Sequence, residues 1–370
     1  MDLSVAGRPV GDRVQFEGGM GSFFLAQLGR FLLTLLTLGI HRFWWKTAVR
    51  RRLWAETTVD GDPLEYMGRG IEMFVGALIV FAAVLIPLSA LSFVAQLLQG
   101  LGQLLWAGLL RLGFFALIVW LIGFAVYRSR RYMLSRTSWR GIRAGMTGNG
   151  VGYAWLSFRL TLLNIVTLGF ATPYGDARRW NALWGDAMLG TMPVKADVEW
   201  RSLMKTFLPA CGGSILAFGL AFAMGWEGLE QVRALAEQEG QLASGDSRVV
   251  GRILKFYGYI ALAFVASALL LTGYRAQFHS EALAATRLDE VEFGFAATTA
   301  DWLRFYLGNI VLVVLTLGIG GLLLQYRLWR FWMSNLRIHG ELDPQAVLQS
   351  QLERPVQGDG LADAFDVGGI

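Results

Sequence analysis

The sequence contains very little cysteine and histidine. Cys211 is the single cysteine and lies inside an apolar block, while His41, His279 and His339 are far apart. One cysteine excludes a disulfide framework or a thiolate metal site within the chain. The histidines lack partners at metal-ligand spacing. We therefore expect no resident metal.

Motifs for phosphate binding and for nucleophilic catalysis are also missing. Neither G-x-x-x-x-G-K-[ST] nor G-x-S-x-G occurs in the chain. The glycine-rich stretch 148–152 resembles a nucleotide loop superficially, but it precedes an apolar segment and has no predicted strand before it. We expect no cofactor, and we predict that the protein is not an enzyme.

Charged residues are scarce and apolar residues are abundant. Only 16% of residues are charged and 54% are hydrophobic, and the apolar residues occur in blocks. Blocks of roughly 20 residues are long enough to cross a bilayer. The net charge of +5 then indicates cytoplasmic loops rich in Lys and Arg. This interpretation excludes nucleic acid and makes membrane lipids the expected partner.

The tetrapeptide Thr37–Ile40 returns at 167–170 and at 316–319, each time at the end of an apolar segment. Such spacing indicates an internal repeat. We predict an all-α integral membrane protein with about seven hydrophobic helices, separated by short amphipathic or hairpin arms. The seven segments are 22–40, 71–94, 106–127, 153–174, 207–226, 255–273 and 305–326.

The arms that follow the apolar segments resemble each other. Asp60-Gly61 between alternating apolar residues is a strong signal for a β-hairpin. The arms align as Arg50–Thr57–Gly61, Arg130–Thr137–Gly141 and Arg179–Asp186–Gly190, and each glycine is expected to adopt the positive φ of a turn. The candidate arm-turn motif comprises Thr57, Asp60, Gly61, Glu65, Tyr66, Thr137, Gly141 and Gly190. The competing interpretation is an interfacial helix that Trp and Arg anchor at headgroup level.

The first arm resembles the YjgN-like family of uncharacterised bacterial inner-membrane proteins. The resemblance is specific over 15–76 and weaker up to residue 343. Later arms depart from it, because Arg140 replaces the turn aspartate and the third arm lacks F-W-x-K-T. The likeness is carried by Thr37–Ile40, Arg42, Phe43, Trp44, Lys46, Thr47, Arg50, Arg51, Trp54, Thr57, Asp60, Gly61, Asp62, Glu65, Tyr66, Gly68, Gly70, Glu72 and Phe74. It implies a multispanning inner-membrane protein of a Gram-negative bacterium and no established activity.

The organisation predicted along the chain follows the repeat. A polar N-terminal lead (1–21) precedes a first membrane repeat (22–150), a second (151–300) and a partial third (301–343). The polar tail, 344–370, is predicted to be disordered.

Two topologies are open. If all seven segments span, the two repeats are inverted, and the more basic arms and the C-terminus lie in the cytoplasm. Alternatively, the three Thr-Leu-Gly segments are re-entrant or interfacial, four helices span, and every arm is cytoplasmic. The length of the segment 305–326 favours seven spans.

Basic residues inside or next to the apolar segments are the candidate binding residues. Arg30 and Arg159 lie within segments that end in Thr-Leu-Gly, and an intramembrane charge is costly unless it has a role. The competing explanation is that each snorkels to a headgroup. Gly39, Gly169 and Gly318 are expected to allow close helix packing or a kink. The remaining candidate lipid contacts are Lys46, Arg50, Arg51, Arg130 and Arg179.

The function predicted from the sequence is therefore coarse. We expect an inner-membrane protein that binds anionic lipid or a partner through its basic, Trp-rich arms. The alternative is a transporter of a small solute or lipid built from inverted repeats. A second copy of the chain is the other partner that the glycine-rich helix faces suggest.

Overall fold

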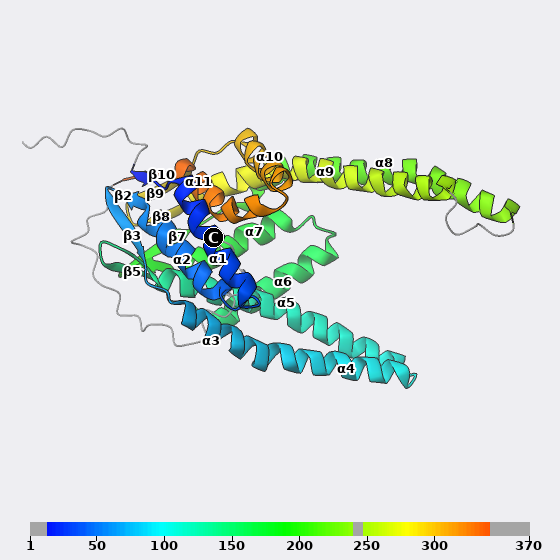
Figure 1. The fold of residues 1–370 in the computed structure, drawn as a ribbon, viewed down its shortest axis with the longest axis horizontal. Helices are drawn as coiled ribbons and strands as arrows, with labels where there is room; N and C mark the ends of the chain where they lie inside the picture. The colour runs from blue at the N-terminus through cyan, green and yellow to red at the C-terminus, as the bar shows by residue number, and fades with distance from the viewer. Residues whose placement is uncertain (1–12, 240–246, 341–370) are drawn as a thin grey trace, which may run out of the picture. The chain divides into compact units, whose positions relative to one another are not determined.

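A computed structural model of the chain describes residues 13–239 and 247–340 (Figure 1). Two compact units are present: the first holds the chain up to Val198 together with 281–296 and everything from Leu307 onward, and the second holds 199–280 and 297–306. The tail predicted to be disordered and the first twelve residues of the predicted lead lie outside the described residues. The repeat boundaries stay a prediction.

Short strands alternate with helices along the chain. The strands are β1 (Val14–Phe16), β2 (Thr57–Val59), β3 (Asp62–Tyr66), β4 (Thr137–Trp139), β5 (Ile142–Met146), β6 (Ala187–Leu189), β7 (Met192–Ala196), β8 (Thr286–Leu288), β9 (Val291–Phe295) and β10 (Leu336–His339). The helices are α1 (Met20–Leu36), α2 (Arg42–Ala55), α3 (Gly70–Val80), the π-helical turn η1 (Phe81–Leu85), α4 (Ile86–Gly100), α5 (Leu104–Ser135), α6 (Gly150–Val166), α7 (Thr172–Gly185), α8 (Trp200–Glu239), α9 (Ser247–Ala284), α10 (Thr299–Leu315), the 3₁₀ turn η2 (Ile319–Leu323) and α11 (Leu324–Asn335).

Tight turns join the strands in pairs. In the first, Asp60 and Gly61 both have positive φ, 53° and 87°, as a two-residue hairpin turn requires. Gly141 and Gly190 have φ of 74° and 58°. The predicted hairpin at 57–66 and the predicted positive φ of these glycines are therefore confirmed.

In the described part of the chain, ten strands form one antiparallel sheet in chain order, all in the first unit. The first and last strands approach each other: Arg13 donates to the carbonyl of Gly340, and Val14 packs with Ile338 in one apolar cluster. The sheet therefore curls around an apolar interior and brings the two ends of the described chain together.

The register of the sheet fixes where each pair of helices begins and ends. Strands separated by two helices pair at the residues next to those helices. These pairs are Phe16↔Thr57, Tyr66↔Thr137, Met146↔Ala187, Ala196↔Thr286 and Phe295↔Leu336. Each helical excursion thus leaves the sheet and returns to it at the same end, opposite the tight turns.

Three of these excursions are short hairpins that turn at Thr-Leu-Gly. We name them the first hairpin (α1 and α2), the second hairpin (α6 and α7) and the third hairpin (α10, η2 and α11). In the first, Thr37 Oγ1 donates to the carbonyl of Leu33 and accepts from the amide of His41. Thr167 and Thr316 make the same pair of bonds. The threonine therefore closes one helix and starts the return.

The backbone of each Thr-Leu-Gly turn is left-handed at two residues. Gly39, Gly169 and Gly318 have φ of 91°, 94° and 94°, a conformation that glycine adopts without steric cost. A Cβ added at any of them meets nothing within 4 Å. The expectation that these glycines serve helix packing or a kink was wrong, because they form the turn.

Four helical segments of the described chain are long and apolar enough to cross a membrane: Gly70–Gly100, Leu104–Ser135, Trp200–Trp226 and Val250–Ala284. The Thr-Leu-Gly helices turn back after 17 residues, so the preferred seven-span arrangement is not supported. The all-α prediction was wrong, since hydrogen-bonded strands connect all the helical excursions. The short excursions return to the end of the sheet from which they left, so the structure gives the inverted repeat no support.

Tryptophan side chains join the arms of the first unit. Trp54 donates to Thr137, Trp180 to Thr286 and Trp329 to Thr57, at 2.8–3.1 Å. Each threonine hydroxyl also donates to the carbonyl four residues before it, at 2.7–2.9 Å. The bond from Trp329 to Thr57 links α11 to β2 and fastens the last hairpin to the first arm.

The second unit contains a long antiparallel pair, α8 and α9. Phe207 packs on Tyr274, with ring centroids 5.1 Å apart, and Phe218 packs on Phe264 at 4.9 Å. Gly225 allows Phe256 to approach closely, because a Cβ there would lie 2.2 Å from that ring. Aromatic packing and one close approach hold the pair together.

Candidate anion-binding pocket

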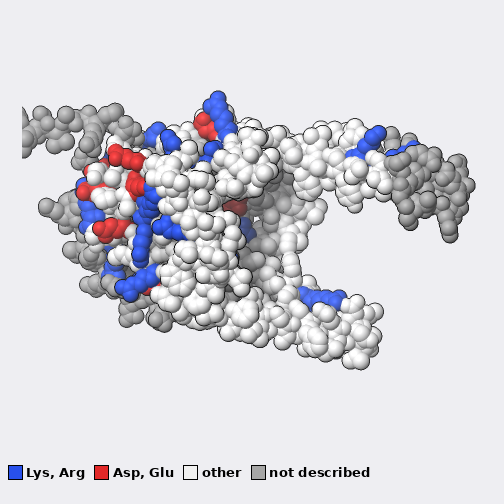
Figure 2. Space-filling model, viewed as in Figure 1, with Lys and Arg blue, Asp and Glu red and all other residues white. Residues whose placement is uncertain are grey.

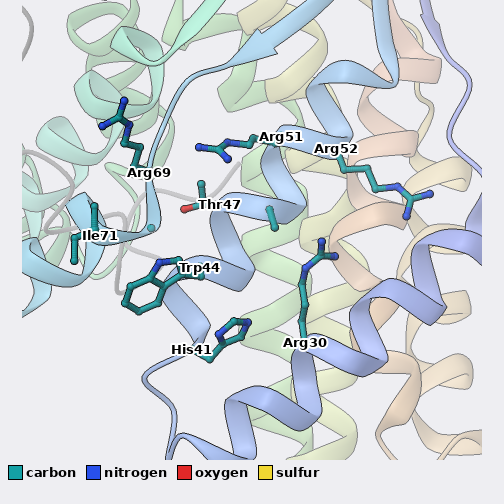
Figure 3. A pocket seen from close by; sticks show the side chains of 10 residues that line it. Arg30, His41, Trp44, Thr47, Arg51, Arg52, Arg69 and Ile71 are labelled. Atoms are coloured by element: carbon teal, nitrogen blue, oxygen red, sulfur yellow. The ribbon is translucent and has the colours of Figure 1, made fainter.

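A cavity of about 700 Å³ lies between α1, α2 and the start of α3 (Figure 3). It belongs entirely to the first unit. Its lining residues are Arg30, His41, Trp44, Thr47, Ala48, Arg51, Arg52, Arg69, Gly70 and Ile71. The lining thus carries four arginines, and none of the ten residues is acidic.

Arg30 enters this cavity from the first hairpin. Its guanidinium lies between α1 and α2, facing the part of α2 that carries Arg51 and Arg52 (Figure 3). Its guanidinium makes a long hydrogen bond of 3.5 Å to the carbonyl of Ala26 on its own helix. Among the described residues, Arg30 has no carboxylate partner. Its charge is therefore available to a bound anion.

Arg51 anchors a loop and also faces the cavity. Its Nη2 donates to the carbonyl of Gly68 at 2.7 Å, on the segment that leads from β3 to α3. One bond uses only part of the guanidinium, which carries five N–H donors in a planar fork. The remaining donors are available to a ligand in the cavity.

Arg52 and Arg69 complete the basic lining. Arg52 is partly neutralised, because its Nε lies 2.7 Å from Glu56 Oε1. Arg69 is the residue before α3 and no side chain caps the first turn of that helix. The first amides of a helix attract anions. Arg69 therefore adds its charge where the helix backbone already favours a negative group.

Two aromatic side chains, His41 and Trp44, also line the cavity. Trp44 is 38% exposed, and the ring of His41 stacks on it with centroids 6.4 Å apart. Gly70 lies against the indole: a Cβ there would be 2.8 Å from a Trp44 ring atom. Glycine is therefore required for α3 to start this close to α2.

The pocket lies at the start of a candidate membrane span. Gly70 and Ile71 line it, and the segment Gly70–Gly100 begins with them. Figure 2 shows Lys, Arg, Asp and Glu gathered over the strand region of the first unit, while its long helices carry few charges. Trp and Arg at the end of an apolar helix are typical of the headgroup level.

A scan of known protein families matches residues 12–364 to a bacterial family of unknown function, DUF898. The chain belongs to the DUF898 family. It is 30% identical over 153 residues to the inner membrane protein YjgN of Salmonella typhimurium, and 28% identical over 158 residues to YjgN of Escherichia coli. These matches cover 41% and 42% of this chain and 36% of each relative, so the chain spans about a third of the length of the curated relatives it matches. No solved structure matches.

Both of these relatives are named inner membrane proteins, and the described part of this chain has four helical segments long and apolar enough to cross a membrane. The family match and the two relatives confirm the resemblance to the YjgN-like family inferred from the first arm. They give no activity, substrate or partner.

The second hairpin lacks the basic lining of the first. Thr167 follows Thr37 by 130 residues, and the same interval relates Ala187 to Thr57 at the first residue of the following strand. The residues 130 positions after the basic lining are Leu160 for Arg30, Ala171 for His41, Asn181 for Arg51, Ala182 for Arg52 and Glu199 for Arg69. The repeated fold therefore does not require these charges.

A comparison of Arg51 with Asn181 shows which part of the role of Arg51 needs a positive charge. Asn181 donates to the carbonyl of Val198 at 3.2 Å and accepts from its amide at 2.8 Å. Val198 follows Asn181 by 17 residues, as Gly68 follows Arg51. A neutral amide is therefore sufficient to anchor this loop.

Several of the other predicted site residues have structural partners. Arg50 is buried, and its guanidinium lies 5.8 Å from the centre of the Tyr66 ring. Arg130 lies 5.2 Å from the Trp184 ring. Arg179 donates to Thr161 at 3.0 Å.

Arg159 and Lys46 are not among the residues that line the cavity. Arg159 donates to the carbonyl of Trp155 on its own helix at 3.3 Å. Lys46 lies on α2 and is not part of the cavity lining. Of the predicted binding residues, Arg30 and Arg51 are the two that the fold brings together in one pocket.

The arm-turn motif forms hairpins and connects arms. Asp60 pairs with Arg13 at 2.5 Å, and Glu65 accepts from Ser138 at 3.1 Å. Tyr66 packs on Trp54, with ring centroids 5.5 Å apart. The predicted alignment of Asp186 with Thr57 was wrong by one residue, because β6 begins at Ala187.

Sequence reasoning missed Arg52, Arg69, His41 and Trp44 as parts of one site. Of these four residues, Arg69 was the easiest to predict from the sequence. It immediately precedes an apolar segment and could have been assigned to a helix N-terminus. The proximity of α1, α2 and α3 carried no local sequence signal.

Proposed function

We propose that this DUF898 protein is a non-enzymatic inner-membrane protein that binds the phosphate headgroup of an anionic lipid in the α1–α2–α3 pocket. The observation that carries the proposal is a cavity lined by four arginines and no acid at the start of a candidate span. Guanidinium groups bind phosphate through two parallel N–H bonds. Trp44 and Ile71 supply apolar surface for the part of the lipid next to the headgroup.

Charge and register support a cytoplasmic position for the pocket. All helical excursions leave the sheet at one end, so the basic arms share one side of the membrane with the strands. Arms rich in Lys and Arg are retained in the cytoplasm, and the cytoplasmic leaflet is rich in anionic lipid. By the same argument, we place β10 and the C-terminus in the cytoplasm.

The argument for a transporter is weaker, because it rested on inverted repeats and on Arg30 and Arg159 as matched intramembrane charges. Arg30 lines the pocket, whereas Arg159 is not part of the lining.

The test is a calorimetric titration of the purified protein, in zwitterionic detergent, with dioctanoyl phosphatidylglycerol. Arg30→Leu and Arg51→Asn place the second hairpin's residues in the first, so both are compatible with the fold. Losing one charge-assisted bond of about 1.5 kcal/mol weakens binding about tenfold. Arg159→Leu is the matched control, because it removes an arginine that lies outside the pocket.

Equal affinity of all three variants would refute a headgroup site in this pocket. Dioctanoyl phosphatidylcholine and inorganic phosphate are titrated in parallel. Tight binding of inorganic phosphate alone, unaffected by the acyl chains, would assign the site to a free anion.

A further inference from the structure

Each Thr-Leu-Gly turn exposes a leucine in an unfavourable conformation. Leu38, Leu168 and Leu317 have φ of 50°, 51° and 50°, in a region that β-carbon sterics disfavour. They are also 94%, 86% and 94% exposed. In water, both the left-handed backbone and the exposed leucine side chain would be unfavourable, yet the arrangement occurs in all three copies.

The helices next to these leucines are apolar and exposed as well. Leu35 and Leu36 are 57% and 80% exposed in the first hairpin, Val166 is 80% exposed in the second, and Val314 and Leu315 are 65% and 77% exposed in the third. Exposed apolar surface of this kind marks a contact with a partner or a membrane. The surface surrounds the tip of each hairpin.

A side-chain hydrogen bond joins the two helices of each hairpin. Trp45 Nε1 donates to Gln27 Oε1 at 2.5 Å in the first hairpin. Arg179 donates to Thr161 in the second, and Arg327 donates to Asn309 at 2.6 Å in the third. The chain therefore turns back at each tip.

The tips lie on the same side of the sheet as the spanning helices of the first unit. The register starts the hairpins and the pair Gly70–Gly100 and Leu104–Ser135 at one end of the strands. In Figure 1, α4, α5 and α6 all run away from the strands. A membrane crossed by α4 and α5 therefore meets the hairpins too.

We propose that the three Thr-Leu-Gly hairpins dip into the acyl chains of the leaflet next to the sheet and return without crossing. This inference does not depend on the phosphate site. Its occupant is the lipid hydrocarbon, because the apolar tips share a side with the helices that cross it.

Charge position limits the depth of each hairpin. The first charged residue after the tip leucine comes four residues later in the first hairpin (Arg42), eight later in the second (Asp176) and ten later in the third (Arg327). At about 1.5 Å per helical residue, these intervals correspond to roughly 6, 12 and 15 Å. Half of a 30 Å hydrocarbon core is about 15 Å. The third hairpin therefore reaches deepest.

The experiment places one cysteine at each tip in a Cys211→Ser background: Leu38→Cys, Leu168→Cys or Leu317→Cys. Each is labelled with an environment-sensitive fluorophore in vesicles of phosphatidylcholine and phosphatidylglycerol. Lys195→Cys, on the exposed face of β7, is the aqueous control. We expect blue-shifted emission at all tips, quenching by spin-labelled lipid in the order 317, 168, 38, and no lipid quenching at 195.

Tips quenched by aqueous iodide as strongly as position 195 would overturn the proposal. So would blue-shifted tips that lipid quenchers do not reach and that crosslink between protomers, because the tips would then cover a second copy. An impermeant maleimide added from one side reports sidedness. Asp62→Cys and Lys195→Cys react from the same side if the hairpins return, and from opposite sides if the second hairpin crosses.

Discussion

The first and third hairpins have the same backbone turn and opposite interiors. In the third hairpin, Arg327 donates to Asn309 at 2.6 Å and joins the two helices. Counting from the threonine of each turn, the same positions in the first hairpin hold Ala48 and Arg30. Both of these residues line the pocket. The third hairpin thus hydrogen-bonds its arginine to an asparagine within the hairpin, whereas the first leaves a cavity beside Arg30, which has no carboxylate partner among the described residues.

The comparison separates scaffold from site. The Thr-Leu-Gly turn, the start of the following strand and the anchor between helix and loop recur in the second hairpin without the basic lining. What these two hairpins share holds the fold together, and the basic lining that the second hairpin lacks is the candidate for ligand binding.

The largest effect is expected when the side chains inside the first hairpin are replaced by those of the third. Arg30→Asn with Ala48→Arg is expected to create in the first hairpin the hydrogen bond that Arg327 donates to Asn309 in the third. The new arginine side chain would also fill the pocket. Because the new guanidinium at position 48 fills the cavity and is held by the asparagine, binding of dioctanoyl phosphatidylglycerol should weaken about a hundredfold, as expected for roughly 3 kcal/mol. Calorimetry measures the affinity, and thermal unfolding checks that stability is retained.

Arg30→Asn alone is the control for this exchange, and it should retain more binding than the double variant because the cavity stays open. Unchanged affinity in a stable double variant would show that the pocket is not the lipid site.

The next effect concerns the threonines that connect the arms. Thr57 is fully buried and accepts from Trp329. Thr57→Val leaves the indole N–H without its acceptor, which costs about 1–3 kcal/mol, so the thermal unfolding midpoint should fall. Thr191→Val, at an exposed turn position, is the control and should change stability by less than about 0.5 kcal/mol. Equal midpoints for the two variants would contradict a stabilising role for the bond.

The smallest expected effect is at the turn glycines. Gly39→Ala forces a β-carbon into φ of 91° and should destabilise by about 1 kcal/mol. Gly29→Ala lies in the middle of α1 with open space around it, so it should stabilise by roughly 0.5–1 kcal/mol. Denaturant titration of both variants in the same detergent measures the difference. Destabilisation by Gly29→Ala would indicate that α1 packs against a surface not accounted for.

The sequence predicted the turns and four of the seven apolar segments well, but it treated the Thr-Leu-Gly segments as spans too. Asp60-Gly61 and Thr-Leu-Gly act over a few residues, so their conformations follow from local sterics and hydrogen bonds. Apolar length misled the prediction, because the segment 305–326 is long enough to cross a bilayer while its glycine at 318 turns the chain back. Strands of three to five residues carry too little periodicity to reveal a sheet.

The candidate pocket shows the same division. Arg30 and Arg51 were recognisable as basic residues near the membrane, whereas Arg69 joined them only because α3 starts against Trp44. Arg50 and Arg179 have the same composition signal and serve packing instead. Residue type alone could not distinguish the two groups.

By itself, the sequence determined the membrane class, the repeat and the tight turns, because apolar block length and local backbone preferences act within a few residues. The tertiary structure decided which apolar segments turn back, at which end of the sheet the helices begin, and which arginines surround a cavity. Those features depend on strand pairs such as Phe16↔Thr57 and Phe295↔Leu336, which join residues about forty apart. No local pattern encodes such pairing, since its free energy comes from surfaces that meet only after the chain has folded.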